Sequence, residues 1–428
     1  LFYREGVFGT VSVSINPRNI KILKINGVGE VPTDYDSMRA FRMLAYLPFM
    51  IHDNPRSLLS IAFGGGITFG SIANTRIPRM KCVEICKDVL DATHPASFDS
   101  WVLYTEEFYR SCRKKLNPGG IMAQWIPLHG LSVSDYQSIL KTFASVFDYT
   151  QLYLANAYSI IIGSRKSLAL KPENFSKWTT QESRIRKELR NIHVTTLSDL
   201  NHCLLLSDSP LRQFAATGTI SRDAFSPLQF AELRSLNREN TLEDNLSALL
   251  KFRQQHHLKN PRLDAYLNAR ILAERGEIPQ VLEFIETLDE GVKSPEVQEL
   301  KHRILLEIAI QRTPDLLRNK NTPTIIETLK SYSERFPKEG YFQSLLGYVY
   351  FKQGQHQQAG DMIRKSIRLS PWNRSVQKIA LNVLSSLSDH PGTLEAVQNL
   401  LRMDPGHPKY KILQAEIKAK TGRHSTGK

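Results

Sequence analysis

Residues 55–85 read PRSLLSIAFGGGITFGSIANTRIPRMKCVEI, and this stretch decides the fold class. Residues 55–63 predict a buried strand that runs into a glycine-rich turn at positions 64–66. A helix-compatible stretch follows, and residues 80–85 predict a second short buried strand that includes Glu84. Because a strand, a glycine-rich turn, a helix and an acid-tipped strand form one βαβ unit, this stretch predicts a dinucleotide or nucleoside site.

The chemistry of this unit depends on its glycines and on one acid. Glycines let the backbone approach a ligand closely. Glu84 follows Gly66 by 18 residues, near the spacing at which an acid accepts hydrogen bonds from ribose hydroxyls. The alternative is that Glu84 is a solvated acid at the end of a strand.

The flanking segments predict the rest of an α/β fold. Residues 2–25 alternate between apolar and polar side chains around a turn at residues 16–19, which predicts two strands, and Asn26-Gly27 is a second turn signal. A helix is predicted at residues 36–51, ahead of the βαβ unit. Helices at residues 104–116 and 134–147 with strands at residues 121–126 and 159–163 predict the closing half of an open α/β sheet.

Composition and charge exclude several other classes of protein. Hydrophobic residues make up 41% and charged residues 23% of the 428 residues, which is ordinary globular composition. The net charge of +14 is compatible with a nucleic-acid or anionic-surface partner but does not require one, and because the excess is spread along the chain it indicates no clear nucleic-acid site. Four cysteines without zinc-ligand spacing predict neither a disulfide framework nor a metal site. No run is long and apolar enough to span a membrane.

Several motifs, taken in order, resemble the spermidine synthase-like polyamine aminopropyltransferases. They cover residues 1–165. A weaker match at residues 192–230 contains Ile220-Ser221-Arg222-Asp223, which is similar to the late acidic loop of the family. The matching stretches are residues 3–11, 26–34, 44–48, 61–70, 83–85, 103–109 and 116–121 with Gln124-Trp125.

The resemblance implies a methyltransferase-like Rossmann sheet behind an N-terminal β-domain. It also implies transfer of an aminopropyl group from decarboxylated S-adenosylmethionine, a co-substrate rather than a permanently bound cofactor, to putrescine or a related polyamine. On the pattern of the family, Asp91 is the catalytic carboxylate that deprotonates the amine. By the same resemblance, the nucleoside is held by Gly64, Gly65, Gly66, Glu84 and Glu30, and the amine is held by Asp34, Tyr104, Gln124 and Asp223.

The chain departs from the pattern of the family in three places. Gly65 stands where relatives carry an acid that holds the aminopropyl amine, and Ala40 stands where they carry a tyrosine. Only six residues separate Glu84 from Asp91. A parallel crossover needs about a dozen residues or more, so about two central βα units, roughly 50 residues, are predicted to be missing. We therefore expect this copy to be inactive or severely impaired.

The C-terminal part of the chain predicts paired helices with a period of 34 residues. Residues 340–373 resemble a tetratricopeptide repeat, with Leu346-Gly347, Tyr350, Gly354, Ala359 and Pro371 at its spacing. Degenerate copies are expected at residues 374–407 and 262–295. The array predicts a protein or peptide partner, and the alternative is an α-helical cap that only covers the α/β domain.

These observations predict three domains: a β-domain at residues 1–35, an incomplete Rossmann domain at residues 36–235 and a helical array at residues 236–428. The first expected function is aminopropyl transfer, and a homodimer is one arrangement to test. The alternatives are a non-catalytic interaction scaffold and a methyltransferase that uses ordinary S-adenosylmethionine. Because the chain begins with Leu1 and is poor in cysteine, we expect an N-terminally truncated fragment located in the cytoplasm or on the cytoplasmic face of a membrane.

Overall fold

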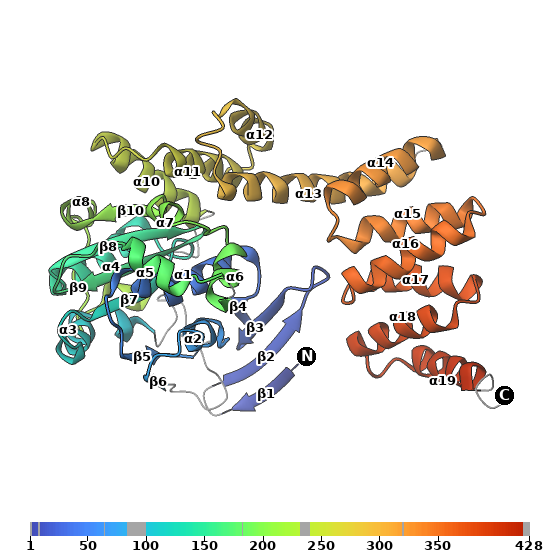
Figure 1. Ribbon diagram of the computed structural model, residues 1–428, viewed down its shortest axis with the longest axis horizontal. Coiled ribbons are helices and arrows are strands. Elements are labelled where there is room, and N and C mark those ends of the chain that lie inside the picture. Colours follow the sequence, from blue (N-terminus) through green and yellow to red (C-terminus); the bar gives the residue numbers. More distant parts are fainter. Residues whose placement is uncertain are drawn as a thin grey trace. The chain divides into compact units, whose positions relative to one another are not determined.

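The computed structural model describes residues 2–6, 9–63, 65–83, 100–181, 183–231, 240–318 and 321–422 (Figure 1). The chain divides into two compact units. The α/β unit comprises residues 2–12 and 23–302, and the helical unit comprises residues 13–22 and 303–428. The helices that follow the expected domain boundary at residue 235 are thus shared between both units. No described helix is long and apolar enough to cross a bilayer.

The N-terminal strands form a four-stranded meander in the order β1-β2-β3-β4. The predicted turns are present, because Asn26 and Gly27 both take positive φ angles (+50° and +84°) between β3 and β4. The two strands predicted at residues 2–25 are therefore three, and a fourth follows the second turn. The strands are β1 (Phe2–Gly6), β2 (Gly9–Ile15), β3 (Lys21–Ile25) and β4 (Val28–Pro32).

The predicted βαβ unit is present as β5 (Ser57–Ile61), α2 (Ile67–Ala73) and β6 (Arg79–Val83). The two strands are parallel and pair from Ser57↔Arg79 to Ile61↔Val83. The prediction that both strands are buried is wrong for one of their faces. Leu59, Ile61 and Val83 are 52%, 42% and 56% exposed, because no third layer covers that face in the part of the chain that the structure describes.

The remaining strands of the α/β unit form a separate antiparallel sheet in the order β10-β8-β9-β7. One continuous open sheet was predicted, whereas no strand among the described residues joins β5 to β7. The place where a joining strand is expected, between Glu84 and Asp91, lies outside the described residues. The strands are β7 (Ile121–Pro127), β8 (Tyr149–Ala155), β9 (Tyr158–Ser164) and β10 (Leu204–Ser207).

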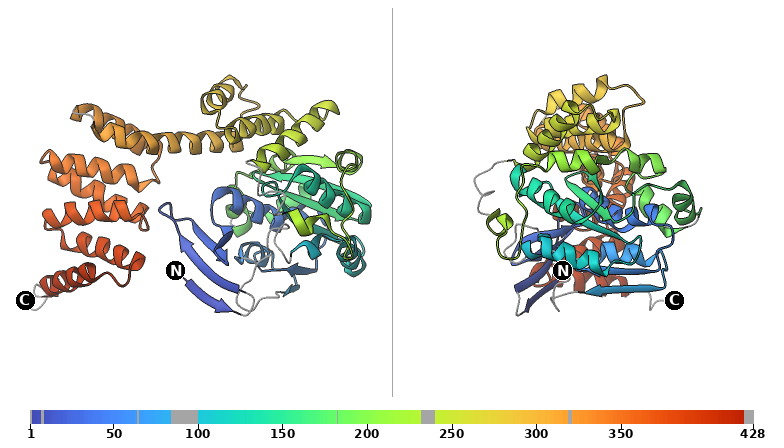
Figure 2. Two further views of the ribbon diagram at one scale, coloured as in Figure 1. Left: turned by 180° about the vertical axis from the view of Figure 1, so that it is seen from behind. Right: turned by 90° about the vertical axis from the view of Figure 1, so that its left-hand side faces the viewer.

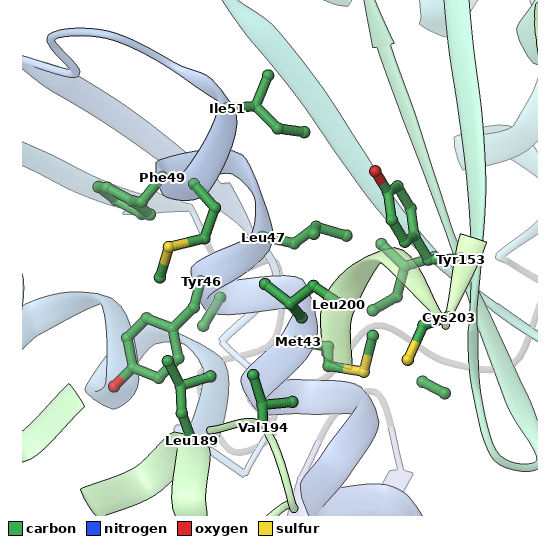
Figure 3. Close-up of a cluster of buried hydrophobic side chains, with 14 of the residues drawn as sticks. Met43, Tyr46, Leu47, Phe49, Ile51, Tyr153, Leu189, Val194, Leu200 and Cys203 are labelled. Atoms are coloured by element: carbon green, nitrogen blue, oxygen red, sulfur yellow. The ribbon is translucent and has the colours of Figure 1, made fainter. Parts of the chain in front are cut away.

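Helix α1 (Tyr35–Ile51) forms the centre of the hydrophobic core of the α/β unit. Asp34 caps its N-terminus by accepting a hydrogen bond from the Ser37 backbone N–H at 2.9 Å. Figure 3 shows Leu47 of α1 pointing toward Tyr153 of β8, and Met43 of α1 lying beside Leu200 on the side of Cys203. Full burial of such side chains contributes about 1.5–3 kcal/mol each relative to exposure, so this face of α1 fixes the helix on the sheet.

Helices α3 (Glu106–Lys115) and α4 (Val133–Val146) lie near the opposite face of the sheet. The Tyr109 ring of α3 meets the Phe143 ring of α4 edge-on at 5.0 Å between centroids. The other helices of this unit are η1 (Trp101–Tyr104), α5 (Pro172–Trp178), α6 (Arg184–Arg190), α7 (Leu197–Asn201), α8 (Asp208–Phe214), η2 (Pro227–Phe230), α10 (Thr241–Gln255), α11 (Pro261–Glu274) and α12 (Ile278–Thr287). Helix α13 (Pro295–Arg318) continues into the helical unit.

The helical unit consists of successive helix pairs, seen in orange and red in Figure 2. Pro337, Pro371 and Pro405 recur every 34 residues, each in the turn after a helix, and the segments predicted at residues 340–373 and 374–407 each contain two helices. Their assignment as tetratricopeptide repeats stays a prediction. The helices of the helical unit after α13 are α14 (Thr322–Arg335), α15 (Gly340–Lys352), α16 (His356–Leu369), α17 (Arg374–Ser386), α18 (His390–Met403) and α19 (Pro408–Gly422).

Candidate functional site

The glycine-rich turn lies between β5 and α2, and two of its glycines are required by sterics. Gly66 has a φ of +72°, and a Cβ there would lie 2.8 Å from the Phe63 ring. A Cβ on Gly65 would lie 2.9 Å from Cγ1 of Val31 in β4. Larger residues therefore cannot fit without displacing a neighbour. Gly64 lies outside the described residues.

Two of the acids expected to act on the ligands also lie outside the described residues, namely Glu84 and Asp91. Glu30 lies in β4, and its side chain is likewise not described. Asp34 is described, and both of its carboxylate oxygens contact Ser37, at 2.9 Å to the backbone N–H and 3.3 Å to the hydroxyl. Its described role is therefore that of a helix N-cap.

Tyr104 and Gln124, expected to line the amine channel, are part of a packed hydrogen-bond network. Tyr104 is 3% exposed. The Tyr109 hydroxyl donates to Oε1 of Gln124 at 2.7 Å, and Nε2 of Gln124 donates to the Leu103 carbonyl at 3.1 Å. Burial raises the pKa of Tyr104 well above its ordinary value. Both functional ends of the Gln124 amide thus bind protein groups.

The loop that contains Asp223 lies at the N-terminal end of α3. The Asp223 backbone N–H donates to Oε2 of Glu107 at 3.1 Å. Arg222 contacts the carboxylate of Glu106 at 2.9 Å, and the Glu106 backbone N–H donates to the Ser221 carbonyl at 2.8 Å. These contacts place Asp223 near η1, which contains Tyr104.

The described candidate residues therefore form two groups rather than one. Tyr104, Gln124 and the Asp223 loop gather around α3, whereas Asp34 and the glycine turn gather around α1, α2 and β4. Trp125, which follows Gln124 along β7, packs with the core of α1, and side chains alternate between the faces of a strand. Gln124 thus lies on the face of the antiparallel sheet near α3, and Trp125 lies on the opposite face, against the core that contains α1.

A further polar cluster, missed by sequence reasoning, lies at the N-terminal end of α1. Asp36 is 9% exposed and its Oδ1 accepts a hydrogen bond from Nδ2 of Asn156 at 2.8 Å. Nη1 of Arg270, on α11, lies 3.3 Å from Oδ2 of Asp36. Only tertiary structure brings these residues together, because 234 positions separate Asp36 from Arg270. An acid in the first turn of a helix was the sole local signal.

Aromatic rings lie beside this cluster. The Tyr158 ring lies 5.3 Å from the Trp125 ring and 5.3 Å from the His129 ring, and its hydroxyl lies 3.1 Å from the Ser37 hydroxyl. Burial raises the pKa of Tyr158 to about 12. Burial lowers the pKa of His129, and this effect is larger than that of a hydrogen bond with the Ala157 backbone, which raises the pKa. The imidazole is therefore neutral at neutral pH.

A second carboxylate network joins α1, α2 and α6. Oε2 of Glu188 accepts hydrogen bonds from the Tyr46 and Ser71 hydroxyls, both at 2.7 Å, and Oε1 accepts one from Nδ2 of Asn74 at 3.2 Å. Its side chain is 13% exposed. The network holds α2, and with it the glycine turn, against α1. Among the residues that the structure describes, no group of His, Cys, Asp and Glu could hold a metal ion.

Comparison with known proteins gives structural similarity only. No protein-family model matches the chain, and no curated protein does. The spermidine synthase of Thermotoga maritima is similar at a TM-score of 0.35 and 18% identity, over 43% of this chain and 78% of that one. A spermidine synthase in complex with the transition-state analogue AdoDATO is similar at a TM-score of 0.39 and 15% identity, over 50% of this chain and 88% of that one.

Proposed function

We propose that the α/β unit is a spermidine synthase-like aminopropyltransferase domain whose turnover is impaired in this chain. One observation carries the proposal: the glycine turn follows β5 directly and leads through α2 into β6, which pairs with β5 in parallel. That is the arrangement of a nucleoside-binding βαβ unit, in which ligands bind beyond the carboxyl ends of the strands. The ordered motifs of residues 1–165 give this unit its family resemblance.

The proposed reaction is an attack by an amine on the carbon next to the sulfonium of decarboxylated S-adenosylmethionine. The amine lone pair forms a C–N bond as the C–S bond breaks, and the sulfonium leaves as a neutral thioether. The proton released from the amine passes to a carboxylate, assigned by resemblance to Asp91. Glu84 and Glu30 are assigned to the nucleoside, and Asp34 and Asp223 to the cationic amine.

Two local features support impairment. An aspartate at Gly65, as in the relatives, would place its Cβ 2.9 Å from Val31, so this chain has filled the space that such an acid needs. Ala40 is completely buried in the core, and a tyrosine there would overpack it. The six residues between Glu84 and Asp91 are also too few for the missing crossover.

The test is a titration of the full chain with decarboxylated S-adenosylmethionine, followed by an assay of aminopropyl transfer to putrescine. We expect binding in the millimolar range and transfer below detection. Gly66→Ala should abolish binding, because it strains a positive φ and meets the Phe63 ring. Gly70→Ala is the matched control, because a Cβ on Gly70, in the same short helix, meets nothing within 4 Å.

Each outcome of this titration separates the alternatives. Micromolar binding with turnover would contradict impairment, and the absence of binding at millimolar concentration would contradict a nucleoside site. Equal losses in the two glycine variants would show that the turn is not the binding element. Tighter binding of ordinary S-adenosylmethionine than of its decarboxylated form would favour a methyltransferase.

A second candidate function, an interaction scaffold, is favoured by the charge of alternate helices in the helical unit. The first helices of the last two pairs, α15 and α17, and the final described helix α19 together contain a single acid, Glu416. An acidic peptide matches that charge. We expect Lys378→Glu to weaken binding of an oligoglutamate peptide and Lys365→Glu, on α16, to leave it unchanged. The basic residues of the three helices are Lys352, Arg374, Lys378, Lys409, Lys411, Lys418 and Lys420.

A further inference from the structure

The contacts around Asp36 differ from those of an ordinary surface ion pair. We define the Asp36 cluster as Asp34, Asp36, Asn156, Tyr158, Arg270 and Glu274. The Asp36 and Arg270 side chains are 12% and 11% exposed. Surface pairs contribute little because water screens them, whereas a nearly buried charge needs a partner of opposite sign. The guanidinium of Arg270 is thus the cation that Asp36 requires.

Arg270 is held from two sides. Its Nη1 lies 3.3 Å from Asp36, and its Nε lies 2.8 Å from Oε1 of Glu274, one turn further along α11. Asp36 is also oriented by the Asn156 amide at 2.8 Å. A carboxylate fixed by an amide on one side and a cation on the other has a preorganised geometry.

The charges within the Asp36 cluster are unbalanced. Asp34, Asp36 and Glu274 supply three carboxylates and Arg270 supplies one cation, whereas Arg39, one turn further along α1, pairs with Glu296 at 2.6 Å. The Tyr158 hydroxyl lies 3.1 Å from the Ser37 hydroxyl, next to Asp36 in the sequence, and aromatic rings favour a nearby cation over an anion. The local chemistry therefore suits a small positively charged group, and Arg270 fills that role from within the chain.

We propose that Arg270 is a built-in cation that occupies the Asp36 cluster and thereby excludes free amines from this end of α1. When its side chain is removed, the cluster accepts a small alkylammonium or guanidinium ion in its place. Arg270 is then a specificity-determining residue contributed by the helices that follow the α/β sheet. The proposal does not depend on aminopropyl transfer, since its readout is binding.

The experiment compares thermal unfolding of the full-length wild type and Arg270→Ala in rising concentrations of putrescine or methylguanidinium, up to about 20 mM. Ionic strength is kept constant with sodium chloride. We expect Arg270→Ala to have a lower melting temperature than the wild type, and we expect either cation to raise that melting temperature again. Its apparent affinity should exceed that of the wild type by about tenfold or more, as expected for one charge-assisted contact.

Two further variants identify the site of any recovery. Arg275→Ala removes a neighbouring arginine that pairs with Glu243 at 2.7 Å outside the cluster, and it should show no such response. The double variant Arg270→Ala with Asp36→Asn should lose the response. The proposal is overturned if the cations raise the melting temperature of Arg270→Ala no more than that of Arg275→Ala. It is also overturned if the cations still raise the melting temperature of the double variant with Asp36→Asn.

Failure of Arg270→Ala to fold also gives a result. If the unfolded variant regains helical circular dichroism in either cation, the proposal is supported, and if neither cation restores it, the proposal is overturned. Arg270→Lys keeps the positive charge and should fold without responding to putrescine. Unfolding of Arg270→Lys to the same extent as Arg270→Ala would show that packing, rather than charge, is what Arg270 supplies.

Discussion

A close approach between two helices of the repeat array gives the sharpest stability prediction. Gly347 of α15 faces α16, and a Cβ there would lie 2.8 Å from Cγ1 of Ile363 and 3.2 Å from the Ala359 carbonyl oxygen. The isoleucine can turn away only partly, because it is completely buried, and the carbonyl belongs to the α16 backbone. Gly347→Ala therefore forces the two helices apart.

Two opposing effects set the change in the free energy of unfolding for Gly347→Ala. Replacing glycine by alanine inside a helix stabilises it by about 1 kcal/mol, whereas overpacking a close contact costs about 1–3 kcal/mol. The net result for Gly347→Ala is a destabilisation of up to about 2 kcal/mol. Gly360→Ala in α16 has the same propensity gain, and its nearest neighbour is the flexible end of Arg364 at 3.4 Å. We expect this control to be stabilised by about 1 kcal/mol.

Urea unfolding of the full chain, followed by far-UV circular dichroism, measures both variants. The two free energies of unfolding should change with opposite signs at an unchanged dependence on urea. If Gly347→Ala stabilises the chain as much as Gly360→Ala does, α15 and α16 are not in the contact described, and the alignment of Gly347 with the small position of a 34-residue repeat has no packing basis.

Three further predictions concern the α/β unit. Burial alone would raise the pKa of Glu188, but hydrogen bonds from Tyr46 and Ser71 outweigh burial and lower it. The stability that the Glu188 network contributes is therefore present above about pH 4.3 and is lost as the pH falls further. In a pH series of urea unfolding midpoints, Glu188→Gln should reduce the loss of stability at acid pH. Burial raises the pKa of Cys203 to about 11, so only about a thousandth of it is thiolate at pH 8, and mass spectrometry should find it unmodified by iodoacetamide until the chain unfolds. Asn245 of α10 is completely buried, and its amide donates hydrogen bonds to the Leu128 and Leu131 carbonyls after β7, at 2.8 Å each. Asn245→Ala should lower the free energy of unfolding in urea by about 2–4 kcal/mol, because both carbonyls lose this partner.

Local patterns were sufficient for most elements of the fold. Apolar periodicity and turn residues predicted α1, α3, α4 and the strands β5 to β7, because each depends on neighbours in sequence. The 34-residue period of Pro371 and Pro405 predicted the last helix pairs for the same reason. The segment before Pro337 was not predicted as part of this period, because its first helix is the end of the long helix α13.

The candidate site could be predicted only as a set of residue types. Asp34 was expected to bind an amine, and its contacts with Ser37 show a cap, which has the same local signature of an acid before a helix. Gln124 was expected in a channel, whereas its amide joins a buried tyrosine and a backbone carbonyl through contacts that no spacing reveals. The ligand-binding roles expected for Asp34, Gln124, Glu84 and Asp91 all stay predictions.

The sequence by itself determined the βαβ unit, the C-terminal helix pairs and the spacing of six residues between Glu84 and Asp91, since propensity, periodicity and chain length act locally. Tertiary structure alone decided that β5 and β6 form a sheet apart from β7, with Leu59 and Val83 exposed. It alone also placed Arg270 against Asp36. Both results depend on which distant segments meet, and that is settled by burial and charge pairing over the whole unit rather than by any stretch of residues.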